Sequence, residues 1–305
     1  MTRALLCSGQ GRLARNMFDM VKSGPAALPI LAAANDLLGA DPLALLASAD
    51  TDTLLENRTS QILCVSRTLC SHAALGLRSP AMVAGYSVGE MAAWSIAGLW
   101  APEQALRLTA RRAELMDAAD GGAGGLGFVR GLDAGQLMRL LDAHDCAIAI
   151  RNPGNMEIIG GKRTAVMAFC ADALAHGAAT ARPIPVHVAS HTPRLEAAVA
   201  PFLSVLAAET LSSPSDQFVL IGAADAMAIA SGAAALPGLA RQLATTIDWT
   251  RVLQTLVERG ARRFLELGPG DALAAMVRGA WPEVEARSLD DFRTMEGAAT
   301  WFEAA

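Results

Sequence analysis

The sequence predicts an α/β fold in which a large domain with a parallel sheet carries an inserted, small ferredoxin-like domain. Two observations predict this arrangement. Short apolar runs that end in glycine-rich turns alternate with longer helical patterns, and a β-α-β-β-α-β order interrupts this alternation in the middle of the chain. Hydrophobic residues make up 52% of the 305 residues and charged residues 18%, a composition that can bury a sizeable core.

The large domain is predicted from four apolar runs, each of which is typical of a strand buried on both faces. They are "RALLCSGQG" (3–11), "PAMVAGYS" (80–87), "FVLIGAAD" (218–225) and "RFLELGPG" (263–270). Amphipathic patterns over 59–77 and 102–119 predict two of the helices between them. We therefore expect a parallel sheet with helices on its faces.

The small domain is predicted from a different pattern. A strand at 126–132 is followed by a helix that Asp133 opens, by strands at 146–152 and 156–161, by a helix at 163–177 and by a strand at 182–190. This order predicts a ferredoxin-like unit at 123–189. Residues 1–122 and 190–305 then form the large domain.

Charge and cysteine content exclude several classes of function. The net charge is −5 and no run of Lys or Arg occurs, which argues against nucleic-acid binding. The five Cys residues show no metal-ligand spacing, so we expect no metal site and a reducing compartment. No leader pattern and no apolar run of about 18 residues occurs, so we expect a soluble cytoplasmic protein without a membrane span.

The stretch "GYSVG" (85–89) matches the G-x-S-x-G elbow, in which a nucleophilic Ser occupies a sharp turn between a strand and a helix. Ser87 would then stand clear of the sheet, and the backbone N–H of Val88 could donate to a developing oxyanion. The alternative is a helix cap, because Ser87 to Glu90 also fits the S-x-x-E capping box.

A Ser nucleophile needs a base, and the chain has five candidates: His72, His144, His176, His187 and His191. His191 follows a predicted strand where a helix begins, which favours it over His187. An ordinary α/β-hydrolase has its catalytic His late in the chain, and here no His follows position 191. A Ser esterase and a catalytically silent docking subunit remain as alternatives.

Several motifs, taken together and in order, resemble the malonyl-CoA:acyl carrier protein transacylase family. They are "SGQG" (8–11), "GYSVGE" (85–90), "RAELM" (112–116), "NPGNMEIIGG" (152–161), "ASHTP" (189–193), "ARQLATTIDWTRVLQTL" (240–256) and "ELGPGDAL" (266–273). The resemblance covers nearly the whole chain and implies an α/β-hydrolase-like large domain. It implies a malonyl transferase activity with no permanently bound cofactor.

The resemblance also implies a role for each matching residue. Ser87 would carry the acyl group, His191 would be general base and acid, and the backbone carbonyl of Gln242 would orient His191. The backbone N–H groups of Gln10 and Val88 would form the oxyanion hole.

Three further residues would bind the substrate. Arg112 would pair with the malonyl carboxylate, which a planar guanidinium can hold through two hydrogen bonds. Gln61 and Asn152 match polar positions near the family's site. Apolar neighbours at 108, 115 and 116 favour Arg112 over Arg111, because they bring it close to the buried stripe of its helix.

The implied partners are malonyl-CoA and an acidic acyl carrier protein with a phosphopantetheine-type arm, for which Arg194 is one candidate contact. One departure from the family is Tyr86, where His is usual. Tyr86 and the stretch "SLDDFRTMEGAATWF" (288–302) resemble the epsilon subunit of malonate decarboxylase, which would add other subunits as partners. The alternative is the transacylase of fatty-acid or polyketide synthesis.

Overall fold

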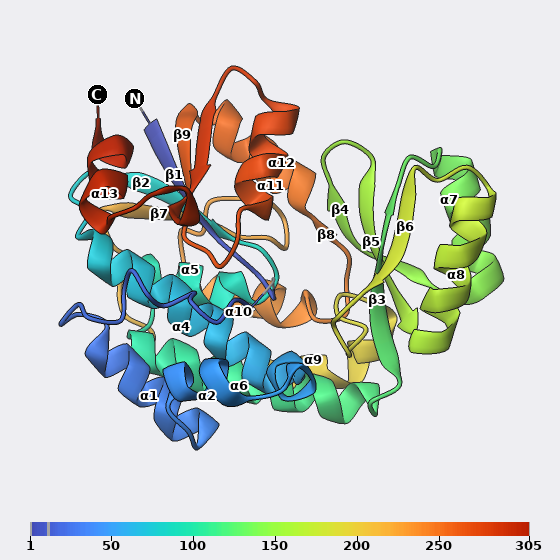
Figure 1. The fold of residues 1–305 in the computed structure, drawn as a ribbon, viewed down its shortest axis with the longest axis horizontal. Coiled ribbons are helices and arrows are strands. Elements are labelled where there is room, and N and C mark those ends of the chain that lie inside the picture. The colour runs from blue at the N-terminus through green and yellow to red at the C-terminus, as the bar shows by residue number, and fades with distance from the viewer. Residues whose placement is uncertain (1, 11–12, 305) are drawn as a thin grey trace.

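Five parallel strands form the first of two five-stranded sheets, which we call sheet A (Figure 1). The computed structural model describes residues 2–10 and 13–304. The strand order is β10-β9-β1-β2-β7. The bounds are Thr2–Cys7 (β1), Ala81–Gly85 (β2), Phe218–Ile221 (β7), Ala261–Glu266 (β9) and Glu285–Ser288 (β10).

Helices cover both faces of sheet A, as Figure 1 shows. Side chains alternate along β1, so that Leu5 and Cys7 enter one core and Ala4 and Leu6 the other. The first core includes α1 (Leu28–Leu38), α4 (Asn57–Leu75), α5 (Gly89–Ile96), α6 (Pro102–Asp120), α9 (Glu196–Ala207), α10 (Gly232–Arg241) and α13 (Met295–Glu303). The second core includes α11 (Trp249–Glu258) and α12 (Ala272–Ala280). Burial on both faces explains why these strands are continuous apolar runs.

The second sheet, sheet B, has the order β6-β3-β5-β4-β8. Its strands are Gly124–Arg130 (β3), Ala147–Asn152 (β4), Met156–Lys162 (β5), Thr180–Ile184 (β6) and Ile247–Asp248 (β8). Helices α7 (Ala134–His144) and α8 (Arg163–Ala175) pack on one face, while Leu126 and Ile150 join the second core of sheet A. The predicted α/β class with a ferredoxin-like unit is therefore confirmed, whereas the domain boundaries stay a prediction.

Three details differ from the sequence analysis. Strand β6 ends at Ile184 instead of 190, because Pro185 has no N–H to donate to a ladder and tight turns at Val186 and Ser190 follow. Strands β8 and β10 were not expected. Both are short, and β8 lies between α10 and α11.

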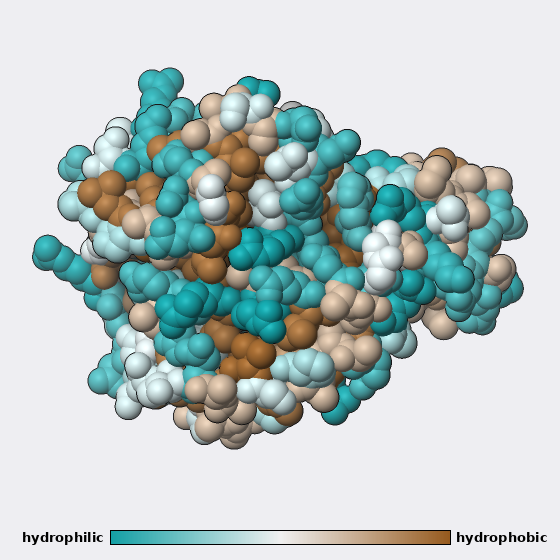
Figure 2. Space-filling model, turned by 90° about the horizontal axis from the view of Figure 1, so that it is seen from below, coloured by the Kyte–Doolittle hydropathy of each residue, from teal (hydrophilic) through white to brown (hydrophobic). Residues whose placement is uncertain are grey.

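The remaining elements are short. They are α2 (Pro42–Ser48), α3 (Thr51–Leu55) and two 3₁₀ turns, Pro193–Leu195 and Leu289–Asp291. Figure 2 shows the lobe of sheet B projecting from the larger body, with hydrophobic residues in separate patches among hydrophilic ones. Within residues 2–10 and 13–304, no single helix has the length and apolar character to cross a bilayer. Only by length and composition would α1 and α2, taken together, be long and apolar enough to cross, and the two helices are bent by 61° from each other.

Candidate active site

Ser87 lies in a sharp turn between β2 and α5 and has a left-handed backbone, with φ of 54°. A Cβ atom on Gly85 would come 2.2 Å from the backbone of Glu90, and one on Gly89 would come 2.2 Å from the carbonyl oxygen of Cys7. The left-handed backbone of Ser87, a non-glycine residue, is strained, and such strain is typical of functional sites. The capping interpretation is wrong, since Val88 is the N-cap of α5 and the cap makes no side-chain hydrogen bond.

We expect Gly85→Ala to destabilise the protein by about 3 kcal/mol or more, because its methyl group would overlap the backbone of Glu90. Gly279→Ala is the matched control. A Cβ atom there meets nothing within 4 Å, and alanine stabilises a helix interior by roughly 0.5–1 kcal/mol. Chemical unfolding of both variants measures the difference, and equal midpoints would contradict a crowded elbow.

His191 contacts Ser87 directly, with its Nε2 2.7 Å from the serine Oγ. Its Nδ1 lies 2.5 Å from the backbone carbonyl oxygen of Gln242. Because a carbonyl only accepts, Nδ1 carries the proton and Nε2 is left to accept from the hydroxyl of Ser87. The other candidate base, His187, is exposed and lies beyond the end of β6.

The electrostatic environment keeps His191 neutral. The residue is 1% exposed, and burial lowers its pKa to about 3. The charge of Arg112 lowers this pKa further, while the hydrogen bond to Gln242 opposes the fall. The imidazole is therefore ready to take a proton at neutral pH.

Gln10 and Ser87 line one pocket of about 170 Å³ between sheet A, sheet B and α12. In the described part of the chain, the backbone N–H groups of Gln10 and Val88 donate no hydrogen bond, so both are open to an incoming oxygen. Gly11, in the same motif as Gln10, lies outside the described residues. Most other lining residues are apolar: Leu126, Ile150, Ile158, Ile184, Val186, Leu273 and Met276.

Arg112 is buried in α6 at 1% exposure, whereas the neighbouring Arg111 is exposed and pairs with Glu114. Arg112 Nη1 donates to Gln61 Oε1 at 2.7 Å, and Nη2 has no partner within the described residues. Burial lowers the pKa of Arg112 to about 10, with the charge of Glu90 opposing. The side chain thus keeps one buried donor available for an anion.

Asn57 connects this arginine to the loop of Gln10, and the sequence analysis missed it. Its Oδ1 accepts from Gln61 Nε2 at 2.7 Å and from Gln10 Nε2 at 3.1 Å. The i, i+4 spacing of Asn57 and Gln61 on one helix was the available signal. Polar side chains therefore link α6, α4 and Gln10, in the loop after β1.

The three residues predicted to bind the substrate do not line the pocket of Ser87. Gln61 and Arg112 lie behind it, although Arg112 is close enough to lower the pKa of His191. Asn152 lies beside the phenol of Tyr86, where it opposes the rise in phenol pKa that burial causes. Arg194, the candidate contact for the carrier protein, forms an ion pair with Asp120 in which Nε lies 3.8 Å from Oδ1.

Tyr86 lines the pocket next to Ser87, with its ring edge-on to Trp249 at a centroid distance of 5.2 Å. Burial raises the pKa of its phenol, so the group stays neutral. The tyrosine therefore supplies an aromatic wall beside the nucleophile and adds no charge there.

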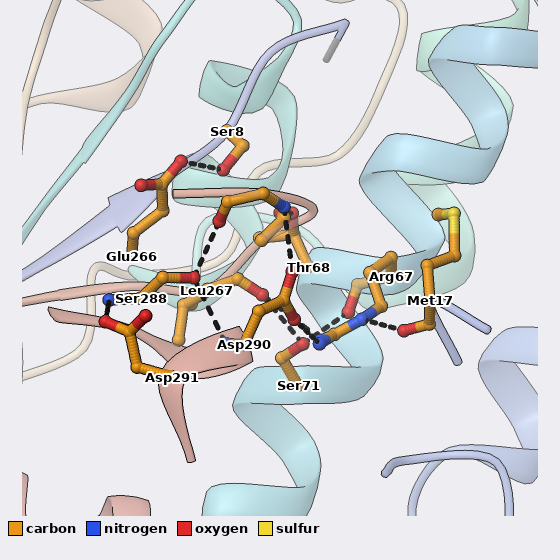
Figure 3. A network of polar contacts seen from close by, with 12 residues as sticks. Ser8, Met17, Arg67, Thr68, Ser71, Glu266, Leu267, Ser288, Asp290 and Asp291 are labelled. Carbon is orange, nitrogen blue, oxygen red and sulfur yellow. Dashed lines mark hydrogen bonds and ion pairs between the residues drawn. The ribbon is translucent and has the colours of Figure 1, made fainter. Parts of the chain in front are cut away.

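The pocket also contains Glu266, to which the sequence analysis gave no role beyond its place in a strand and a family motif. It is 1% exposed, accepts from Ser8 Oγ and the backbone N–H of Ala274 at 2.8 Å each, and has its pKa raised to about 8 by burial. Figure 3 shows how the following loop is held. Arg67 donates to the carbonyl of Leu267 at 3.2 Å and pairs with Asp290 at 3.0 Å.

Comparisons with known proteins show the family of the chain. A family model described as "Acyl transferase domain" matches residues 57–287. The malonyl CoA-acyl carrier protein transacylase of Mycobacterium tuberculosis is 30% identical over 292 residues, which cover 94% of this chain and 95% of the relative. The enzyme of that name from Escherichia coli K12 is 27% identical over 305 residues, with 97% and 98% covered.

Solved structures share the fold over almost the full length. A malonyl CoA-acyl carrier protein transacylase from Coxiella burnetii has a TM-score of 0.90 at 25% identity, covering 99% of this chain and 97% of that one. A structure described as a type II PKS acyl-carrier protein in complex with its malonyl-transacylase has a TM-score of 0.90 at 26% identity, with 98% and 99% covered.

Proposed function

Because the chain belongs to the acyl transferase domain family and is an acyl-carrier-protein S-malonyltransferase, we propose that it loads the carrier of fatty-acid or polyketide synthesis through a malonyl-Ser87 intermediate. The observation that carries the proposal is the hydrogen-bonded series from Ser87 through His191 to the carbonyl of Gln242. It is the arrangement of an activated nucleophile, its base and the group that orients the base.

In the first step, His191 Nε2 takes the proton of Ser87 as Oγ attacks the thioester carbonyl of malonyl-CoA. The negative charge that develops on the carbonyl oxygen is stabilised by the backbone N–H groups of Gln10 and Val88. The carbon–sulfur bond then breaks, and the sulfur of CoA leaves with the proton held by His191. The product is a malonyl ester on Ser87.

The second step repeats this chemistry with the thiol of the carrier's phosphopantetheine-type arm. His191 takes the thiol proton, the sulfur attacks the ester, and Ser87 recovers a proton as it leaves. Arg112 holds the malonyl carboxylate through its open Nη2 donor, with Gln61 fixing the other side of the guanidinium. Asn152 acts on the substrate only indirectly, because it contacts the phenol of Tyr86, which lines the pocket.

The names of the relatives favour fatty-acid or polyketide synthesis over malonate decarboxylase as the setting. Part of the stretch 288–302 also has a structural role. Asp290 pairs with Arg67, and Ser288 Oγ donates to the carbonyl of Gly270 at 2.6 Å, so both hold the loop that lines the pocket. Tyr86 is the feature that still favours the malonate decarboxylase carrier, which therefore remains the second candidate.

A loading assay with purified holo carriers tests the proposal. The enzyme is mixed with malonyl-CoA and one acidic carrier of fatty-acid synthesis, of a type II polyketide synthase or of malonate decarboxylase. We expect the highest kcat/KM with one of the first two. Preference for the third would overturn the proposed setting, and rapid release of free malonate without any thiol acceptor would favour the esterase alternative.

A further inference from the structure

Glu90 is a buried carboxylate three residues after Ser87, and the transfer steps above give it no part. It lies in the first turn of α5 and is 1% exposed. Its oxygens accept from Gln242 Nε2 at 2.8 Å, from the backbone N–H of Ala223 at 3.3 Å and from Trp94 Nε1 at 3.4 Å. All three partners are donors, so they match an ionised carboxylate, which only accepts.

Gln242 joins this carboxylate to the base. Its side chain donates to Glu90, and its backbone carbonyl accepts from His191 Nδ1 at 2.5 Å. The residue is 2% exposed and caps the C-terminal end of α10, where its N–H bonds to Gly238. Fixing the side chain of Gln242 at Glu90 therefore restrains the direction of the carbonyl that orients the imidazole.

Two titratable groups within the described residues face Glu90 from other elements, the guanidinium of Arg112 on α6 and the thiol of Cys7 on β1. Burial raises the pKa of Glu90 to about 7, and the bonds from Gln242, Ala223 and Trp94 and the charge of Arg112 oppose this rise. Burial and the charge of Glu90 raise the pKa of Cys7, so this thiol stays neutral. Arg112 is thus the counter-charge of Glu90.

From these contacts we propose that Glu90 is a positioning residue whose carboxylate holds Gln242, and through it the imidazole of His191, in the geometry that activates Ser87. This inference rests on the proposed function, because it assigns Glu90 to acyl transfer at Ser87. Protonation would place an O–H group among three donors and weaken the bond to Gln242.

A pH dependence follows from this role. Acylation of Ser87 slows as the pH falls through about 7, because Glu90 takes up a proton there. This fall in rate below about pH 7 is called the acid limb of the pH–rate curve. His191 does not cause it, since the pKa of His191 is about 3. Removing the carboxylate at position 90 therefore removes the limb and leaves His191 titrating at much lower pH.

The test is rapid-quench acylation of the full chain by malonyl-CoA across the neutral pH range. We expect Glu90→Gln to lose the acid limb and to acylate roughly 10- to 100-fold more slowly on the plateau, as for a misplaced catalytic group. Gln242→Leu keeps the backbone carbonyl but breaks the link, so a similar loss of rate is expected. Trp94→Phe is the comparison variant, because it leaves the carboxylate and its bond to Gln242. It should keep the plateau rate and a fall in rate at low pH, moved to higher pH because one donor that lowers the pKa of Glu90 is lost.

A second readout needs no substrate. The ¹⁵N chemical shift of His191 Nδ1 should change in Glu90→Gln and Gln242→Leu, and remain as in wild type in Trp94→Phe. An acid limb that persists in Glu90→Gln, or an unchanged His191 signal in both link variants, overturns the inference. If Glu90→Gln does not fold, the acylation rate and the His191 signal of Gln242→Leu decide whether the inference holds. Wild type that takes up no malonyl group at any pH refutes the proposed function instead.

Discussion

Ser87→Ala is expected to lower the rate of malonyl transfer from CoA to a carrier protein by roughly four orders of magnitude or more, as when the nucleophile of a Ser–His pair is removed. The hydroxyl of Ser87 is the group in contact with His191 Nε2, and the elbow holds it there with a left-handed backbone. Alanine keeps the backbone of the turn but has no atom that can form the ester. The measurement is kcat/KM for carrier loading.

Ser95→Ala is the matched control, because Ser95 lies on α5, the helix that follows Ser87, and does not line the pocket. We expect wild-type transfer from this variant. Substantial transfer by a folded Ser87→Ala protein would mean that the malonyl group passes directly between thiols, and the covalent mechanism would have to be abandoned.

Arg112→Met is expected to lower kcat/KM for malonyl-CoA about 30- to 1000-fold, since loss of one partner of a buried charge pair costs about 2–4 kcal/mol. The malonyl carboxylate would lose the Nη2 donor and enter a buried site without a counter-charge. Acetyl-CoA has no carboxylate, so its kcat/KM falls much less. The measured quantity is the ratio of the two kcat/KM values.

Arg111→Met serves as the control for this prediction. Arg111 is the next residue along α6, but it is exposed and pairs with Glu114, so we expect the preference for malonyl to be unchanged. A folded Arg112→Met variant with wild-type selectivity would remove Arg112 from the substrate site.

The architecture could be predicted from the sequence because burial leaves a pattern. Strands β1 and β2 lie between two cores, so nearly all their residues are apolar, and each ends in a glycine-rich turn. The β-α-β-β-α-β order was predicted from turns and helix starts such as Asp133, which forms a capping box in the structure. The two-residue strand β8 leaves no such pattern, because its pairing depends on where β4 lies.

The candidate site was predictable only in part, for a physical reason. Ser87 carries a local signal, because crowding in its turn excludes a Cβ atom at two flanking positions. Gln242 acts through its backbone carbonyl, which every residue type has, so only the family resemblance indicated it. Glu266 and Asn57 are polar residues in ordinary helical or strand contexts, and their place at the site depends on tertiary packing.

Intact-mass analysis of the chain mixed with malonyl-CoA, without any carrier, tests the covalent intermediate most directly. The account predicts a mass increase of one malonyl group, mapped by peptide analysis to Ser87, and its loss when a holo carrier protein is added. Ser87→Ala should show no increase. A folded wild-type chain that gains no malonyl group, or gains it at another residue, would contradict the account.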